Sequence, residues 1–189
     1  MTAFKQFTNQ TPDLELVHAF KKGDGKEFVF RLLIKKYQQK LYWHIRKICI
    51  SHDDTDDVLQ NTFIKVWQNL DNFKEEAKLY TWLYRIATNE ALAFINKQKG
   101  SLRVSIEDVA EELSSKLDDN SHISGEKIQI ELQKALLTLP EKQRLVFNMK
   151  YFDEMKYEDM SEILETSVGA LKASYHHAVK KIENYFNPG

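Results

Sequence analysis

Two groups of side chains in this sequence have the residue types that bind nucleic acids. The first combines aromatic and basic residues: Phe73, Lys74, Tyr80, Trp82 and Arg85. Aromatic rings, here including Tyr84, stack on unpaired bases while a guanidinium holds the phosphate backbone. Taken alone, the spacing fits a packed core better, because Trp and Tyr at helical intervals usually pack. The segment 31–50 holds six Lys or Arg and no acid, which makes single-stranded DNA binding a credible interpretation.

The second group lies near the C-terminus, on the polar face of a predicted helix. Its members are Lys172, His176, His177 and Lys180. A short helix over 157–164 precedes this one, and Ser167 is placed to cap the longer helix. A short helix, a tight turn and a longer helix with basic outward residues fit a helix-turn-helix. Such lysines contact phosphates and such histidines approach base edges, whereas a solvated helix face is the alternative.

A third group has the donor types of a metal site. Its members are His52, Asp53, Asp54, Asp56 and Asp57. A metal-dependent phosphohydrolase needs further ligands on neighbouring helices, and only His18 and His44 are upstream candidates. Acids just ahead of a helix are favoured by the positive end of its dipole. Helix capping is therefore the preferred interpretation, and the phosphohydrolase is a distant alternative.

Helices must position these groups, and the sequence predicts an all-α chain. Only six Gly and three Pro occur among 189 residues, which favours helices over a many-turned β protein. A third helix is expected after the acidic cluster, with an apolar stripe formed by Leu59, Phe63, Val66, Trp67 and Leu70. Its opposite face is polar and includes Asp57, Gln60 and Asn61. A loop over 71–79 leads to a fourth helix, from near Tyr80 to about Gln98.

The chain divides at an acidic segment. Residues 100–125 are rich in Ser and Asp and lack aromatics, so we expect a flexible linker there. Residues 1–99 and 126–189 then form two small helical domains. The net charge of −1 argues against strong DNA binding by the chain alone. One cysteine, Cys49, and the lack of a signal peptide or transmembrane stretch predict a cytoplasmic protein.

Five sequence segments together carry a resemblance to a known family. They are Asp56–Trp67, Tyr80–Asn89, Leu139–Arg144, Tyr157–Leu164 and Ser167–Lys172. The first resembles region 2.2 of the sigma-70 family, in its extracytoplasmic function (ECF) group. The second resembles regions 2.3 and 2.4, and the last three are similar to region 4. The five segments thus make up three motifs, namely region 2.2, regions 2.3 and 2.4, and region 4. Three motifs in family order and at family spacing are far more specific than one.

The resemblance implies a fold, a function and partners. It implies a region 2 helical bundle over 1–99 and a region 4 helix-turn-helix over 126–189, joined by the linker. It implies a sigma factor that binds core RNA polymerase, directs it to specific promoters and helps melt DNA, with no catalysis or cofactor of its own. The implied partners are the β′ clamp helices and β flap of the polymerase, promoter DNA and an anti-sigma factor.

The resemblance also implies roles for individual residues. Polymerase binding falls to Asp57, Gln60 and Asn61, the last standing where the family usually has Glu. Minus-ten DNA binding falls to Phe73, Lys74, Tyr80, Trp82, Arg85 and Asn89. Minus-thirty-five DNA binding falls to Ser167, Lys172, Ala173, His176, His177 and Lys180. Glu165 occupies a turn position where the family often has Gly. A stand-alone helix-turn-helix regulator is the second hypothesis, favoured by the basic helix face and opposed by the near-zero net charge.

Overall fold

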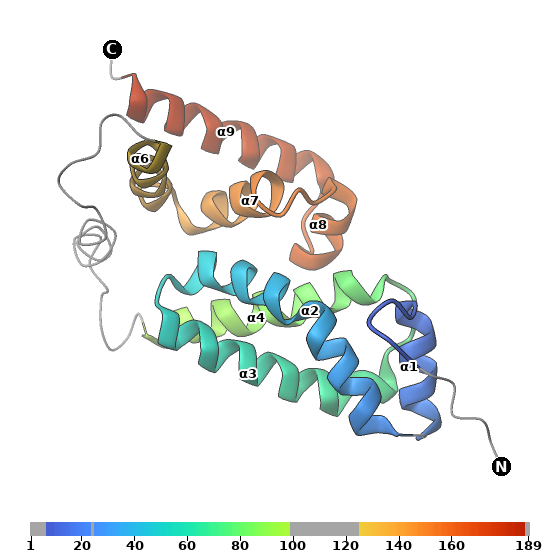
Figure 1. Cartoon of the computed structure of the whole chain (residues 1–189). Coiled ribbons are helices and arrows are strands. Elements are labelled where there is room, and N and C mark those ends of the chain that lie inside the picture. The colour runs from blue at the N-terminus through green and yellow to red at the C-terminus, as the bar shows by residue number, and fades with distance from the viewer. Residues whose placement is uncertain (1–6, 24, 99–124, 188–189) are drawn as a thin grey trace. The chain divides into compact units, whose positions relative to one another are not determined.

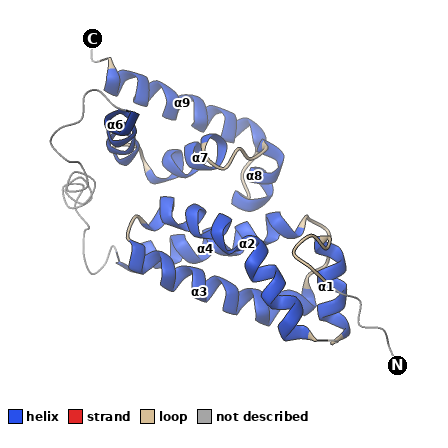
Figure 2. Ribbon diagram, viewed as in Figure 1, coloured by secondary structure: helices blue, strands red, loops and turns tan. Residues whose placement is uncertain are grey.

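The computed structural model describes residues 7–23, 25–98 and 125–187. Within these ranges all regular secondary structure is helical, and turns and loops join the helices (Figure 2). The prediction of an all-α chain is therefore confirmed. The predicted acidic linker lies outside the described residues, except for Gly125, where a helix begins.

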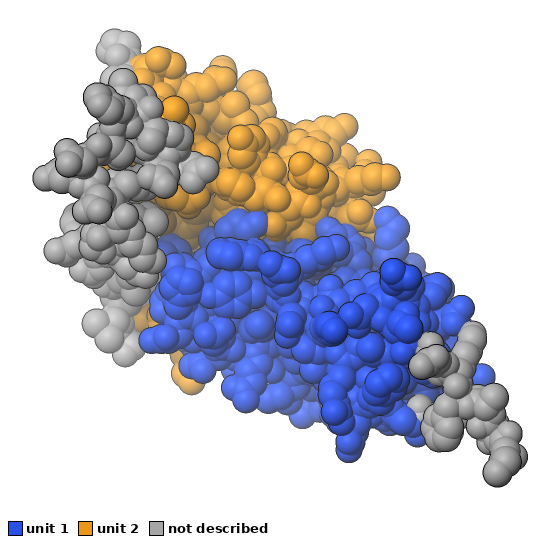
Figure 3. Space-filling view, in the orientation of Figure 1, with its two compact units in different colours: residues 1–95 blue, residues 96–189 orange. Residues whose placement is uncertain are grey.

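The chain forms two compact units, Met1–Ile95 and Asn96–Gly189 (Figure 3). The helices that begin in the first unit (Figure 1) are α1 (Asp13–Lys22), α2 (Lys26–Cys49), α3 (His52–Asn69), the 3-10 helix η1 (Leu70–Asn72) and α4 (Leu79–Gln98). Those described in the second are α6 (Gly125–Leu137), α7 (Glu141–Tyr151), α8 (Tyr157–Leu164) and α9 (Val168–Phe186). The presence of two helical domains, expected from the sequence, is confirmed.

The first unit is built around α2, which contacts both α1 and α3. Its buried face includes Leu33, Leu41 and Ile45, which recur at helical spacing. A further link ties α2 to α1, since the Tyr37 hydroxyl donates to an Asp13 carboxylate oxygen at 2.5 Å. Burial of these apolar side chains supplies most of the driving force for the bundle.

A buried hydrogen bond joins α2 to α4. His44 Nε2 lies 2.8 Å from Thr88 Oγ1, and the Thr88 hydroxyl donates to the Tyr84 carbonyl at 2.7 Å. A hydroxyl has one proton, so Thr88 accepts from His44, whose Nε2 must carry hydrogen. This pair fixes the axial position of α4, the helix that carries the predicted aromatic cluster.

The prediction that the acidic cluster precedes the third helix is wrong. Helix α3 begins at His52, so Asp53 and Asp54 lie in its first turn. The reason is that Ser51 takes the cap position, with its hydroxyl accepting from the Asp54 backbone N–H at 3.5 Å. The positive end of the helix dipole still stabilises carboxylates that lie inside the first turn.

Of the predicted apolar stripe, Val66 of α3 and Leu70 of η1 are buried, and Leu59 and Phe63 are half-buried. The other buried residues of α3 are Thr55, Val58 and Thr62, so its inward face is turned from the predicted one. Trp67 remains 38% exposed, and its ring meets Phe20 and Phe30 edge-on at centroid distances of 5.1 and 5.0 Å. Edge-to-face contacts of this kind add to the stabilisation from area burial. Trp67 therefore closes the rim of the core beside α1.

The second unit packs α6, α7 and α8 against α9. Its core contains Ala135, Leu136, Leu139, Phe147, Ala178 and Ile182. The Phe147 and Tyr175 rings stack with centroids 5.6 Å apart. Because α9 buries Leu171, Ala178 and Ile182 on one face, its opposite face is left to solvent.

Candidate nucleic-acid interface

Helix α4 presents a polar and aromatic face away from the core. At about 100° per residue, Trp82, Arg85 and Asn89 fall within about 60° of one another around the helix axis. Arg85 and Asn89 are exposed, and Trp82 is half-buried. The structure therefore places an aromatic ring, a guanidinium and an amide along one side of α4, a combination suited to an unpaired nucleic-acid strand.

Tyr80 lies on a different side of α4 from Trp82. Its ring packs on Tyr84, with centroids 4.6 Å apart, and Tyr84 in turn meets His44 at 4.8 Å. Tyr84 is only 4% exposed, so the hypothesis that its ring stacks on a base is wrong. The physical reason is that Tyr84 lies on the side of α4 that packs against His44 of α2. Tyr80 is half-buried in the first turn.

The loop before α4 buries one predicted DNA-binding residue and exposes the next. Phe73 is 4% exposed, and its ring lies against Trp82, with centroids 5.1 Å apart and planes at 46°. Lys74 is exposed. Phe73 thus supports Trp82 and offers no free face to a base, while Lys74 projects a positive charge beside it.

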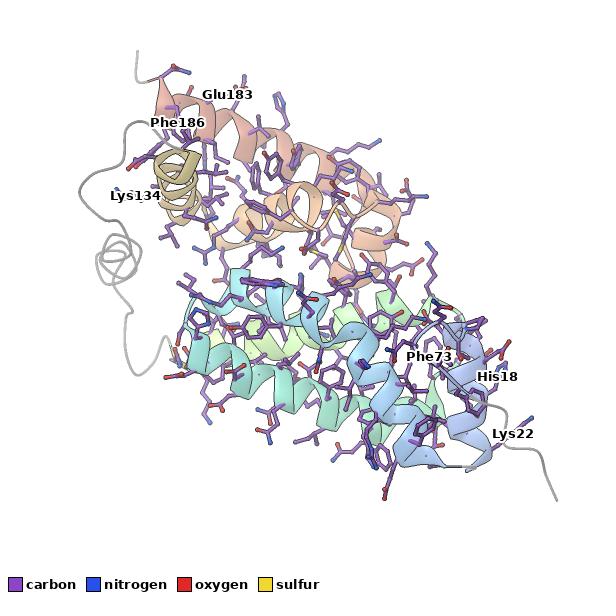
Figure 4. The ribbon with its side chains drawn as sticks, in the orientation of Figure 1. His18, Lys22, Phe73, Lys134, Glu183 and Phe186 are labelled. Atoms are coloured by element: carbon purple, nitrogen blue, oxygen red, sulfur yellow. The ribbon has the colours of Figure 1, made fainter. Side chains whose placement is uncertain are left out.

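Contacts from α1 to this loop were not foreseen in the sequence. Lys21 Nζ donates to the Phe73 carbonyl at 2.6 Å and to Glu75 Oε1 at 3.1 Å. His18 Nε2 lies 3.0 Å from both Glu75 carboxylate oxygens. These hydrogen bonds hold the pKa of Glu75 below its usual range, and the bond from Lys21 has the larger effect. Figure 4 shows His18 on α1 with Phe73 beside that helix. Partners more than 50 residues apart leave no spacing signal in the sequence.

The polar face of α3 is exposed as predicted from its periodicity. Asp57, Gln60 and Asn61 all lie in solvent, at the i, i+3 and i+4 positions that form one patch on a helix. The structure adds Ile64, which is 47% exposed and follows Gln60 by four residues. The sequence gives no signal for its exposure, because an apolar residue on a helix is expected to be buried. Ile64 adds an apolar side chain beside the polar patch, as the centre of a protein interface often has.

The helix-turn-helix is formed by α8 and α9. Glu165 ends α8 with φ of 49°, the left-handed conformation that a Gly adopts readily. Ser167 caps α9 as predicted, its hydroxyl accepting from the Ala170 backbone N–H at 3.3 Å. The predicted minus-thirty-five residues of α9 are all exposed: Lys172, Ala173, His176, His177 and Lys180. They span about 140° of the helix surface, so one face carries them all.

Lys172 is partly ordered by a neighbour on α8. Its Nζ lies 5.7 Å from the centroid of the Tyr157 ring, within cation–π range. Lys150 Nζ lies 5.0 Å from the same centroid. Two lysines therefore share one aromatic ring at the base of the helix-turn-helix, which concentrates positive charge there.

The acidic cluster does not assemble with other ligands. Over the described ranges, no group of three or more His, Cys, Asp or Glu side chains is arranged to hold a metal ion. His52 Nδ1 instead lies 2.6 Å from the Tyr42 hydroxyl. Burial raises the pKa of the Cys49 thiol to about 12, which makes it a poor nucleophile. Among the described helices, none is long and apolar enough to cross a membrane.

Comparison with known proteins matches both units. The family model for sigma-70 region 2 matches residues 33–101, and that for sigma-70 region 4 matches residues 129–182. An ECF RNA polymerase sigma-E factor from Haemophilus influenzae is 31% identical, over 95% of this chain and 97% of its own length. The ECF RNA polymerase sigma-E factor of Escherichia coli is 30% identical, over 96% of this chain and 97% of that protein.

Two solved structures share the fold. CnrH in complex with the cytosolic domain of CnrY has a TM-score of 0.68 at 21% identity, covering 93% of this chain and 97% of CnrH. The sigma factor RpoE of Bartonella quintana, in complex with the anti-sigma factor NepR, has a TM-score of 0.63 at 20% identity. That match covers 83% of this chain and 96% of RpoE.

An all-helical chain with a region 2 bundle and a region 4 helix-turn-helix is a transcription initiation factor of the sigma-70 class. Within that class, the chain belongs to the ECF sigma factors. Its role is to direct RNA polymerase to promoters for initiation, and it is a regulatory factor, not a catalyst. This assignment takes precedence over both the stand-alone regulator and the phosphohydrolase.

Proposed function

We propose that the outward face of α4 captures the unpaired strand of the minus-ten element. The supporting observation is that Trp82, Arg85 and Asn89 share one face of this helix, with Lys74 in the adjoining loop. Stacking on Trp82 offsets the stacking that a flipped base loses, and this contribution is about 1–3 kcal/mol per base. Arg85 and Lys74 neutralise phosphates, and Asn89 supplies an amide for hydrogen bonds to a base edge.

Tyr80 and Phe73 contribute to minus-ten binding in different ways. Tyr80 lies in the first turn of α4, on a different side from Trp82, and is half-buried against Tyr84, so we assign its exposed edge a DNA contact at the start of α4, separate from the Trp82 face. Phe73 is buried behind Trp82 and acts by supporting that ring. The face of α4 that carries Trp82, Arg85 and Asn89 is formed before DNA binds. This preorganisation lowers the entropy cost of binding a melted strand.

We assign polymerase binding to the patch on α3. Asp57 and Gln60 offer polar contacts to the β′ clamp helices, and Asn61 makes a neutral contact where the family usually places a charge. Ile64 adds an apolar anchor at the same face. A small apolar centre with a polar rim is the usual anatomy of a protein interface. Region 4 is assigned to the β flap.

We assign minus-thirty-five recognition to the exposed face of α9. Lys172 and Lys180 contact phosphates. His176 and His177 approach base edges in the major groove. Ala173 and the Ser167 cap lie in the N-terminal part of the helix and contact DNA there. The chain carries 27 basic and 28 acidic residues, so polymerase must supply part of the affinity for DNA.

The remaining assignments concern boundaries and regulation. We propose region 2 over 1–99, a linker over 100–125 and region 4 over 126–189. The solved relatives CnrH and RpoE were each captured with a protein partner, CnrY and the anti-sigma factor NepR respectively. An anti-sigma factor that covers the DNA-binding faces is accordingly proposed for this chain, together with action in the cytoplasm, where polymerase is found.

Promoter melting with core polymerase tests the α4 assignment. Trp82→Ala is expected to lower the amount of open complex roughly 5- to 150-fold, the range of one lost stacking contact. Permanganate reactivity of unpaired thymines and run-off transcripts from genomic promoters report the effect. Trp43→Ala is the matched control, because Trp43 is an exposed tryptophan on α2 outside this face. Wild-type opening by Trp82→Ala would refute the assignment.

A further inference from the structure

We propose that Lys21 on α1 is a positioning residue for promoter recognition. By binding the chain on both sides of Lys74, it sets the loop that presents Lys74 and Trp82 to the minus-ten element. This inference rests on the proposed role of α4 and its preceding loop. Lys21 itself is directed at the protein, not at DNA.

The contacts of Lys21 bracket Lys74. Its ammonium donates to the carbonyl of Phe73, the residue before Lys74, at 2.6 Å. It also donates to the carboxylate of Glu75, the residue after Lys74, at 3.1 Å. The bond to the Phe73 carbonyl is partly buried, whereas the bond to the Glu75 carboxylate is exposed. A charged donor shared between a backbone oxygen and a carboxylate is a strong restraint on the loop.

The backbone of Glu75 requires such a restraint. Its φ is 63°, in the left-handed region where a residue with a side chain is strained. Strain of this kind persists only where the surroundings hold the residue in place. The Glu75 carboxylate is held by Lys21 and by His18, whose Nε2 lies 3.0 Å from both of its oxygens. Helix α1 therefore dictates the shape of the loop.

The loop is coupled to the α4 face through Phe73. Its buried ring contacts Trp82 with centroids 5.1 Å apart, and Lys21 Nζ lies 6.0 Å from the Phe73 centroid. A second tie lies upstream, where Lys26 Nζ bonds both Asp71 carboxylate oxygens at 2.9 and 2.8 Å. With the loop held upstream at Asp71, loss of Lys21 frees the segment from Phe73 onward, so the change falls on Lys74 and Trp82.

Helix α1 ends before the part of the chain that matches sigma-70 region 2, which begins at residue 33. Lys21 and His18 are thus outside the matched segment, although they contact the loop within it. The neighbouring Lys22 is exposed and carries the same charge on the same helix (Figure 4). Lys22 provides a matched control for the loss of one positive charge.

Base preference in promoter opening by the full chain with core polymerase tests the inference. The promoters carry a randomised minus-ten element, and a fluorescent adenine analogue there reports base flipping. Lys21→Met is expected to lower opening about threefold to tenfold and to weaken the base preference. Lys21→Arg, which keeps a charged donor, is expected to restore both, and Lys22→Met to match wild type. Thermal unfolding and affinity for core polymerase are measured for each variant.

The outcomes separate this inference from the proposed function. Unchanged opening and base preference in Lys21→Met, with Trp82→Ala impaired, overturn the role of Lys21 alone. Lower opening with an unchanged base preference, not rescued by Lys21→Arg, assigns Lys21 to folding only and also overturns it. If Trp82→Ala opens promoters normally, the proposed function fails. If Lys21→Met does not fold, Glu75→Gln provides the same test with a smaller change.

Discussion

The buried ring of Phe73 lies against Trp82, with centroids 5.1 Å apart and planes inclined by 46°. Phe73 directly follows η1, and its N–H donates to the Leu70 carbonyl at 3.2 Å. Trp82 lies in the first turn of α4. This contact joins the loop that carries Lys74 to the helix that carries Arg85. Of two predicted DNA-binding aromatics, Phe73 is thus buried as support, and Trp82 is the one that we propose as the contact surface.

Truncation of Phe73 should therefore impair both stability and DNA opening. Phe73→Ala leaves a cavity under Trp82, and we expect the free energy of unfolding of the first unit to fall by about 3–5 kcal/mol. Urea unfolding followed by tryptophan fluorescence measures the loss. Phe28→Ala is the control, since Phe28 is 53% exposed and should cost little. Equal stability of the two variants would contradict the burial-based argument.

The hydrogen bond between His44 and Thr88 should contribute to the stability of the first unit. Thr88→Val preserves side-chain shape but removes the hydroxyl that accepts from His44. A buried donor left without its partner costs about 1–3 kcal/mol, so the urea midpoint should fall with the m-value unchanged. Thr8→Val is the control for loss of an exposed hydrogen bond, because the exposed Thr8 hydroxyl accepts from the Gln10 backbone N–H at 3.2 Å. A midpoint shared by Thr88→Val and wild type would show that the bond contributes nothing net.

Restoring the charge that the family usually carries at residue 61 should strengthen polymerase binding. Asn61 is exposed on α3, so Asn61→Glu is accommodated without repacking. A solvent-exposed charge contact is worth up to about 1 kcal/mol, which corresponds to roughly fivefold in the dissociation constant from core polymerase. Fluorescence anisotropy of labelled protein at two salt concentrations measures it. A gain that disappears at high salt supports the assignment, and weaker binding would count against it.

The contacts of Glu75 should make the α1–loop contact sensitive to acid. Its pKa is lowered in the folded protein, chiefly by hydrogen bonds from Lys21 and then His18. A depressed folded pKa contributes stability that is present above the unfolded value, about 4.3 for Glu, and is lost as pH falls through the folded value. Wild type and Glu75→Gln should therefore differ near neutral pH and converge only at a pH below the lowered folded pKa of Glu75. Amide exchange of the loop measures this, and a constant difference at every pH would exclude it.

Much of the helical architecture could be predicted from the sequence alone. Helical periodicity is a local property, so the outward faces of α3 and α9 follow from the spacing of their apolar residues. The cap at Ser167 follows equally, because a serine before an apolar helical run accepts from the backbone N–H groups of the first turn. The resemblance of the motifs to the sigma-70 family then supplied the function that these faces serve.

The tertiary structure decided which aromatic residues are buried and what holds them. Phe73, Tyr84 and Trp82 are alike in type and close in sequence, yet only packing against His44 and the rest of the bundle buries Tyr84 and leaves Trp82 half-exposed. The link from Lys21 to Glu75 spans 54 residues, and no periodicity relates two such distant positions. Contacts of that kind arise only when helices pack, because packing brings side chains together irrespective of their separation along the chain.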